Sequence, residues 1–215
     1  MKASKMIEIA ESYLDYNEED GSFKEIIDLY NSQDPLPVNY KVKYTDQWCA
    51  TFVSAVALKA GYEDFPFECS CPRMIKELKK MDCWIENDAY YPKAGDLILY
   101  DWSDKGKGDD RNEPDHVGIV QRTIGNKIYV IEGNYHHKVG IRKIEVDGRY
   151  IRGFGKLDYE QEIHVGDLVD YDIYEYRGVK VKSYSRGIVV YITKNEYVVD
   201  QDGKIILVNK EDIKK

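Results

Sequence analysis

The segment from Trp48 to Gly61 constrains the fold more than any other part of this sequence. Its apolar residues recur at intervals of three and four, which is the spacing of one face of an α-helix. They are Phe52, Val53, Val56, Ala57 and Ala60. Gly61 follows at the position where the end of a helix favours a left-handed residue. The spacing therefore predicts a helix that ends before Gly61 and packs on the core through this apolar face.

Further helices are expected on both sides of this segment, and strands after them. Met6, Ala10 and Leu14 have the spacing of an amphipathic helix, and Pro72 suits the first turn of a helix over 73–81. Beyond it, short β-branched and aromatic runs alternate with Gly, Asp and Asn, which is typical of antiparallel strands. These runs are "AGDLILYDW", "DHVGIVQR", "KIYVIEGN", "GIRKIEV" and "RYIRGFGKL". This order indicates an α+β fold with helices packed on one face of an antiparallel sheet.

A second, smaller domain is expected after Tyr159. Polarity rises around "LDYEQEIHVGDLVDYD", and a new series of strand patterns then begins. Alternation of apolar and polar residues is the pattern of half-buried strands. We therefore divide the chain into residues 1–159 and 160–215, and expect a small β-barrel in the second part.

Composition and charge exclude several classes of partner. The 215 residues carry a net charge of −8 without a block of Lys or Arg, which argues against a nucleic-acid partner. No apolar run approaches the ~20 residues that a membrane-spanning helix needs. Glu8 and Glu11 interrupt the apolar residues near the N-terminus, so no signal peptide is predicted. We expect a monomer that is made in the cytoplasm.

The cysteines other than Cys49 show no metal-binding pattern. Cys69 and Cys71 are closer together than the C-x-x-C pair that is typical of zinc sites. We expect Cys69, Cys71 and Cys83 to be structural thiols. A disulfide between Cys83 and one of the others is the alternative.

Cys49 is the first candidate for chemistry. The unpaired N–H groups at a helix N-terminus stabilise a thiolate and lower its pKa below the free value of about 8.5. This placement favours a nucleophile, although a buried cysteine that merely fills space at the helix start remains an alternative.

His116 and the segment "VIEGN" can supply the partners of such a nucleophile. His116 stands at the entrance to an apolar strand, where a neutral imidazole can serve as a base for a thiol. Residues two apart on a strand point the same way, so Glu132 and Asn134 can both be offered to one place. One of them would orient His116 as the third member of a triad. Taken alone, a histidine at a strand entrance is also compatible with a purely structural role.

Four motifs in order, "WCATFVS", "AGDLILYDW", "DHVGIV" and "VIEGN", resemble the CHAP family, the cysteine, histidine-dependent amidohydrolases/peptidases of the papain-like NlpC-type superfamily. The resemblance covers about 44–157. It implies that Cys49 is the nucleophile, His116 the base, Glu132 the orienting group and Asn134 a fourth active-site residue.

The usual activity of that family is cleavage of peptidoglycan, at the amide between N-acetylmuramic acid and L-alanine or within the peptides. Many members are phage lysins with a C-terminal SH3-like wall-binding module, which the residues from about Ile163 resemble in length and strand pattern. A phage-type release, or another non-classical route, would then bring the protein to the wall.

Other parts of the site are expected on chemical grounds. The side-chain amide of Gln47 could bind the oxyanion beside the N–H of Cys49, or it could cap the turn. Trp48, Trp102 and Asp115 are candidates for the walls of the substrate cleft, although for Trp48 a place in the core is preferred.

No cofactor is expected. Some members of the resembling family bind calcium, and the acidic segments "NEEDGS" and "DWSDKGKGDDRNEPD" raise this possibility, but neither has the spacing of a loop that wraps this ion. Three alternative functions remain open. The chain could be a wall-binding protein without activity, an intracellular amidase acting on a protein or a glutathionyl-spermidine amide, or a scaffold for a C-terminal Tudor-like or ribosomal-type binder.

Overall fold

The structure is a computed structural model that describes residues 2–105, 112–159, 168–176, 179–192, 196–201 and 203–214. The chain divides into two compact units, Met1–Tyr159 and Glu160–Lys215. Each unit is described by itself.

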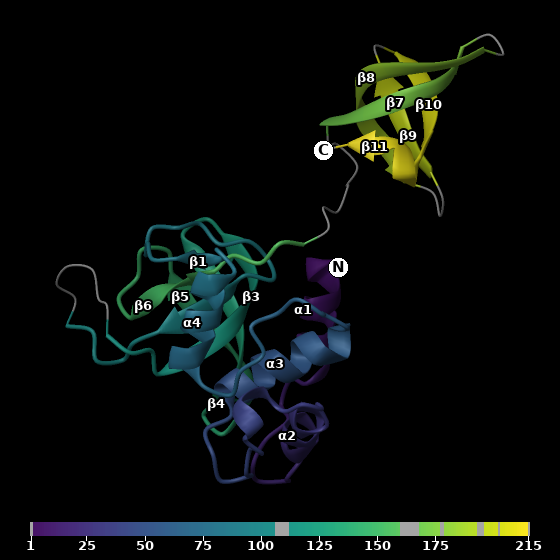
Figure 1. Ribbon diagram of the computed structural model, residues 1–215. Coiled ribbons are helices and arrows are strands. Elements are labelled where there is room, and N and C mark those ends of the chain that lie inside the picture. Colours follow the sequence, from purple (N-terminus) through teal and green to yellow (C-terminus); the bar gives the residue numbers. More distant parts are fainter. Residues whose placement is uncertain are drawn as a thin grey trace. The chain divides into compact units, whose positions relative to one another are not determined.

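The first unit combines helices with an antiparallel sheet, which confirms the predicted α+β class (Figure 1). Its helices are α1 (Ala3–Ser12), α2 (Lys24–Asn31), the short 3-10 helix η1 (Pro37–Asn39), α3 (Cys49–Ala60) and α4 (Cys71–Lys80). Its strands are β1 (Trp84–Ile85), β2 (Leu97–Tyr100), β3 (His116–Ile124), β4 (Lys127–Tyr135), β5 (Lys138–Glu145) and β6 (Ile151–Gly155). The strand order is β1-β6-β2-β3-β4-β5, and every neighbouring pair is antiparallel.

Helix α3 lies at the centre of this unit. It contacts α1 and α2 as well as strands β3 and β4, and all of its residues from Cys49 to Ala57 are buried. A helix that is covered on all sides belongs to the core rather than to the surface. The prediction of a single buried face was therefore too narrow, whereas the predicted end is confirmed by Gly61, whose φ is 81°.

A glycine lets β4 approach α3 closely. A Cβ added to Gly133 would lie 2.3 Å from Cβ of Phe52, a distance that real structures do not show. Only a residue without a side chain permits this contact.

The second unit contains a five-stranded antiparallel sheet of order β10-β9-β8-β7-β11. Its strands are β7 (Leu168–Tyr176), β8 (Val179–Ile192), β9 (Glu196–Gln201), β10 (Lys204–Asn209) and β11 (Ile213–Lys214), with a 3-10 turn η2 (Lys210–Asp212) before the last strand. Val189, Val199 and Val208 are buried together and form a small core of this unit.

Two expectations about the whole chain can be compared with the described residues. Within them, no helix is both long enough and apolar enough to span a membrane. All four cysteines are free, so the alternative of a disulfide with Cys83 is wrong for this structure.

Candidate active site

Cys49 is the first residue of α3, as the sequence predicted, and it is almost completely buried. Trp48 precedes it at the N-cap position and is fully buried. The indole Nε1 of Trp48 donates a hydrogen bond of 2.9 Å to Glu18 Oε1. The preferred place of Trp48 in the core is therefore confirmed, and the alternative, that it forms a wall of a substrate cleft, is wrong.

His116 and Glu132 come together from neighbouring strands. His116 begins β3, Glu132 lies in β4, and His116 Nε2 is 2.9 Å from Glu132 Oε2. Glu132 is fully buried. Gly118 makes room for it, because a Cβ at position 118 would lie 2.7 Å from Cγ of Glu132. Since Nε2 is engaged by the carboxylate, Nδ1 is the ring nitrogen left for Cys49.

Arg142 completes the polar cluster and was not predicted. Its Nε donates to both carboxylate oxygens of Glu132, at 2.8 and 2.9 Å. The guanidinium lies over the rings of Tyr135 and Trp102, 4.6 and 4.7 Å from their centroids. Such cation–π contacts favour a charged group in a partly desolvated place. Arg142 therefore balances the charge of Glu132, and it shares the oxygen Oε2 with His116.

The hairpin of β4 and β5 explains how Arg142 reaches Glu132. Arg142 is paired with Val130 in the antiparallel register, which places it diagonally across from Glu132 on the same face. A sequence signal for this contact existed, since a carboxylate in an apolar strand requires a positive partner. Identifying that partner requires the register of β4 with β5, which the sequence motifs do not give.

The electrostatics favour a thiolate and imidazolium pair. Hydrogen bonding with Cys71 and then with His116 lowers the pKa of Cys49 well below its ordinary value, although burial opposes this shift. The N–H of Ala50 in the first turn of α3 acts in the same direction. Burial tends to lower the pKa of His116, but its interactions with Cys49 and Glu132 outweigh burial and raise this pKa to about 9. The arrangement thus favours an anionic sulfur beside a protonated ring.

Cys71 also lies at this site, although it was predicted to be a structural thiol. It is the first residue of α4, and its Sγ is 3.7 Å from Sγ of Cys49. The hydrogen bond with Cys49, followed by burial, raises the pKa of Cys71 well above its ordinary value. The pKa values of the two sulfurs are therefore shifted in opposite directions, which favours Cys71 as the donor of this hydrogen bond.

Asn134 and Gln47 meet each other rather than the histidine. Asn134 Nδ2 donates a hydrogen bond of 2.6 Å to Gln47 Oε1. The backbone of Asn134 has a φ of 57°, and the register of β4 with β5 shifts between Glu132 and Tyr135. The alternation assumed from sequence therefore breaks before Asn134, and of these two residues it is Glu132 that contacts His116. This contact uses the oxygen of the Gln47 amide, so its nitrogen is left to donate to another group.

Trp102 and Asp115 lie beside His116 at the surface. Trp102 is 39% exposed, stacks on Tyr100 with ring centroids 4.9 Å apart, and has its centroid 5.9 Å from that of His116. Asp115 is exposed, and its Oδ2 accepts a hydrogen bond of 2.8 Å from the backbone N–H of Trp102. Asp115 therefore holds the turn that carries Trp102. Part of the acidic loop between them, residues 106–111, lies outside the described residues.

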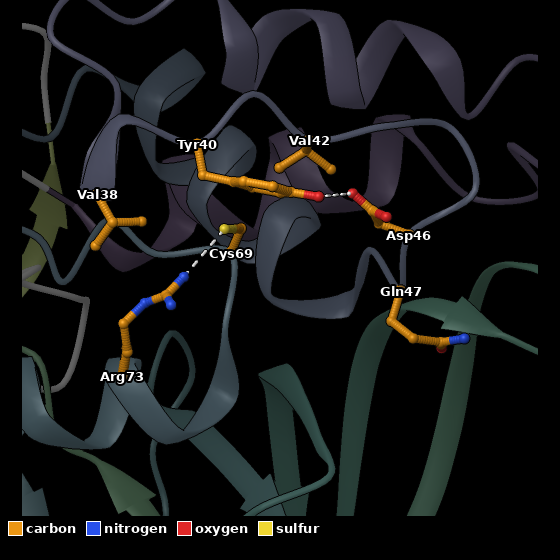
Figure 2. A pocket seen from close by; sticks show the side chains of 7 residues that line it. All are labelled: Val38, Tyr40, Val42, Asp46, Gln47, Cys69 and Arg73. Atoms are coloured by element: carbon orange, nitrogen blue, oxygen red, sulfur yellow. Dashed lines mark hydrogen bonds between the residues drawn. The ribbon is translucent and has the colours of Figure 1, made fainter.

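Two hollows flank the segment that leads into the nucleophile. The first, of about 470 Å³, is shown in Figure 2. The second, of about 410 Å³, shares Asp46 and Gln47 with it. The first is lined by Val38, Tyr40, Val42, Asp46, Gln47, Cys69 and Arg73, and the second by Glu18, Tyr44, Thr45, Asp46, Gln47, Asn134, His136 and His137. Both hollows therefore lie beside Gln47, two residues before Cys49.

Within the part of the chain that the structure describes, no three His, Cys, Asp or Glu side chains are grouped so that they could hold a metal ion. The first acidic segment, "NEEDGS", belongs to the described residues, whereas residues 106–111 of the second lie outside them.

The family model described as CHAP domain matches residues 39–134 of this chain. The resemblance inferred from the four motifs is thereby confirmed for this segment, which contains Cys49, His116, Glu132 and Asn134. A search of curated proteins found no match. CHAP domains are in general hydrolases that act on peptidoglycan, so the match indicates an amidase or peptidase activity in general.

Proposed function

We propose that this protein is a cysteine hydrolase that cleaves an amide bond of peptidoglycan through Cys49, His116 and Glu132. The observation that carries the proposal is the buried contact of His116 with Glu132 at 2.9 Å, next to a thiol at the start of α3. A nucleophile, a base and a group that orients the base are the parts that such chemistry requires.

In the proposed reaction the thiolate of Cys49 attacks the carbonyl carbon of the amide. The imidazolium of His116 protonates the leaving amine as the C–N bond breaks, which leaves a thioester on Cys49. Neutral His116 then takes a proton from water, the resulting hydroxide attacks the thioester, and the thiolate departs with the acid product released. The ion pair is restored, and Glu132 with Arg142 holds the ring in one orientation throughout.

The tetrahedral intermediates need hydrogen-bond donors for their oxyanion. We assign the backbone N–H of Cys49 as the first donor and the side-chain amide of Gln47 as the second. Gln47 suits this role because its oxygen already accepts from Asn134, which fixes the direction of its nitrogen. Asn134 is then a positioning residue for Gln47 rather than for His116.

We propose that the peptide part of the substrate binds in the hollows beside Gln47. The first hollow offers apolar side chains, the carboxylate of Asp46 and the guanidinium of Arg73, a mixture that fits a peptide with small apolar side chains and charged ends. Trp102 offers a flat, partly exposed ring next to the catalytic histidine.

The second unit is proposed to be an SH3-like module that holds the enzyme on the wall. Support comes from its strand arrangement, a five-stranded antiparallel sheet around a small valine core, and from its position after a CHAP domain match. On this proposal the protein acts in the manner of a phage lysin, as a monomer that reaches the wall after release from the cell.

Comparison of the wild type with Cys49→Ala tests the activity. Purified peptidoglycan should be solubilised by the wild type and not by the variant, and circular dichroism should show that both are folded. Mass spectrometry of the products identifies the bond: a free N-terminal L-alanine means an amidase, whereas a freed stem or bridge amine means a peptidase. Equal solubilisation by both proteins, or by neither, would refute the proposed hydrolase and leave a wall-binding protein or an enzyme with another amide substrate.

A further inference from the structure

The contact between Cys49 and Cys71 brings together two sulfurs that the proposed hydrolysis does not both need. Their Sγ atoms are 3.7 Å apart, and each residue is only 5% exposed. A disulfide bond is about 2.05 Å long, so the sulfurs would have to approach by roughly 1.7 Å. Each cysteine is the first residue of its helix, where a preceding non-helical segment can absorb a small movement.

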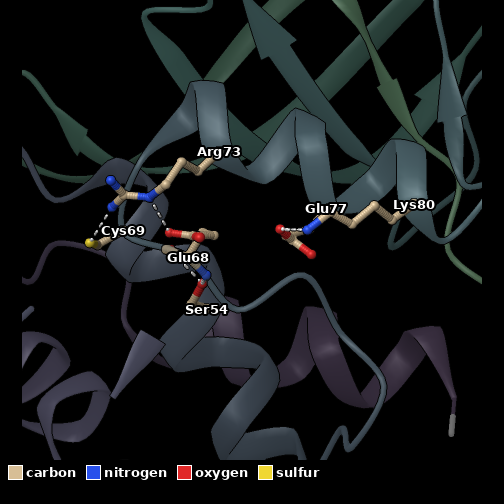
Figure 3. A network of polar contacts seen from close by, with 6 residues as sticks. All are labelled: Ser54, Glu68, Cys69, Arg73, Glu77 and Lys80. Carbon is tan, nitrogen blue, oxygen red and sulfur yellow. Dashed lines mark hydrogen bonds and ion pairs between the residues drawn. The ribbon is translucent and has the colours of Figure 1, made fainter. Parts of the chain in front are cut away.

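A polar network fixes the approach of α4 to α3, as Figure 3 shows. Ser54 Oγ in α3 donates to the carbonyl of Glu68 at 2.8 Å and accepts from the Glu68 N–H at 3.0 Å. The Glu68 carboxylate then accepts from Nε of Arg73 in α4 at 2.9 Å. Ser54 is fully buried and Glu68 nearly so. Because α3 and α4 are joined next to Cys71, the contact between the two sulfurs is part of the packed structure.

The other cysteines have different partners. Cys69 Sγ accepts from Nη2 of Arg73 at 3.5 Å, and Cys83 Sγ donates to the carbonyl of Met81 at 3.2 Å. Neither sulfur contacts Cys49 among the described hydrogen bonds, so these residues are matched controls for Cys71.

The chemistry of the pair is asymmetric. A peroxide is attacked by a thiolate, and Cys49 is the thiol whose pKa is lowered. The attack forms an S–O bond, breaks the O–O bond and gives Cys49 sulfenic acid and hydroxide. The sulfur of Cys71 then attacks the Cys49 sulfur and displaces the hydroxyl group, which leaves as water with the proton of the Cys71 thiol. Overall two thiols lose two electrons and two protons, and hydrogen peroxide becomes two molecules of water.

We infer that Cys71 is the resolving thiol of Cys49 and that peroxide closes a reversible Cys49–Cys71 disulfide. While it is closed, Cys49 has no thiolate and cannot act as a nucleophile. The disulfide also protects the sulfur of Cys49, because a sulfenic acid that no second thiol captures is oxidised further to the irreversible sulfinic acid. The bond formation stands on the geometry of the two thiols, and only its effect on hydrolysis rests on the proposed function.

The test treats the reduced full-length protein with hydrogen peroxide and maps the products by mass spectrometry. The wild type should lose two hydrogens, give a peptide pair joined through Cys49 and Cys71, and regain its free thiols and wall-clearing activity with dithiothreitol. Cys71→Ser should instead gain oxygen atoms at Cys49 and stay inactive after reduction. Cys83→Ser should behave as the wild type does.

Two results would overturn the inference: a wild type that gains oxygen at Cys49 without the joined peptides, or a disulfide that uses Cys69 or Cys83. The wild-type map decides this even if Cys71→Ser does not fold. A protein that forms the predicted disulfide but clears no walls contradicts only the proposed function. One that clears walls and never forms the disulfide contradicts only the role of Cys71.

Discussion

Replacing Arg142 by methionine should destabilise the first unit and change the titration of His116. The variant keeps an apolar side chain of similar length among the aromatic rings but leaves the fully buried Glu132 with His116 as its remaining charged partner. Breaking a buried ion pair costs about 3–5 kcal/mol when the remaining charge has no partner. Here the side chain of Arg142 is already 26% exposed and His116 stays 2.9 Å from the carboxylate. We therefore expect a loss of about 2–3 kcal/mol in the free energy of unfolding.

The pH dependence separates an electrostatic role of Arg142 from a structural one. Activity requires protonated His116 to deliver a proton to the leaving amine, so it should decline as pH rises through about 9. Arg142 repels the imidazolium, and its removal should raise the pKa of His116 and move this decline to higher pH. Arg142→Lys keeps the charge but loses the contact with both carboxylate oxygens, so it should lose stability with little change in the alkaline decline.

Urea unfolding at neutral pH gives the stability, and the rate of wall clearing between about pH 6 and about pH 11 gives the profile. If Arg142→Met unfolds like the wild type, the ion pair does not stabilise the fold. If it is destabilised but its alkaline decline stays at the wild-type pH, or moves lower, the assignment of Arg142 as the charge partner of the Glu132 and His116 pair is wrong.

The remaining predictions concern two neighbours of this pair. Glu132→Gln removes the anion that helps to raise the pKa of His116, so the alkaline decline of activity should move to lower pH, opposite to the shift expected for Arg142→Met. The same variant should lower kcat by about 10²–10⁴. An unchanged pH profile would show that Glu132 does not act on the ring of His116. Gly133→Ala places a Cβ 2.3 Å from Cβ of Phe52 and should lower the free energy of unfolding by about 3 kcal/mol in thermal denaturation. Gly125→Ala is its control, since no atom lies within 4 Å there and only the φ of 57° opposes the change, at about 1 kcal/mol; equal losses at both positions would contradict the close approach of β4 to α3.

The helices and strands of the first unit could be predicted from sequence because their signals are local. The three-and-four spacing before Gly61 located α3, and the five apolar runs after Pro72 correspond to β2 through β6. Periodicity reports which residues of an element are apolar, but not how many neighbours cover them. For this reason α3 was expected to bury one face and is instead buried from Cys49 to Ala57.

The contacts that the motifs missed join residues of different elements, ten to thirty positions apart in the sequence. Trp48 was considered for a cleft wall, yet its indole donates to Glu18, thirty residues earlier. Arg142 reaches Glu132 only through the register of the β4 and β5 hairpin. Cys71 reaches Cys49 only because α4 packs against the start of α3.

The sequence by itself determined an α+β chain with a thiol at a helix start, a histidine at a strand entrance and a carboxylate near a strand end. Those assignments depend on local backbone preferences, which can be read from each segment without knowing what packs against it. Only the tertiary structure decided that Glu132 rather than Asn134 contacts His116, that Arg142 balances the carboxylate, and that a second thiol lies against the first. The physical reason is that charge balance and hydrogen bonding inside a protein depend on which atoms are within a few ångströms, and that is set by strand register and helix packing rather than by spacing along the chain.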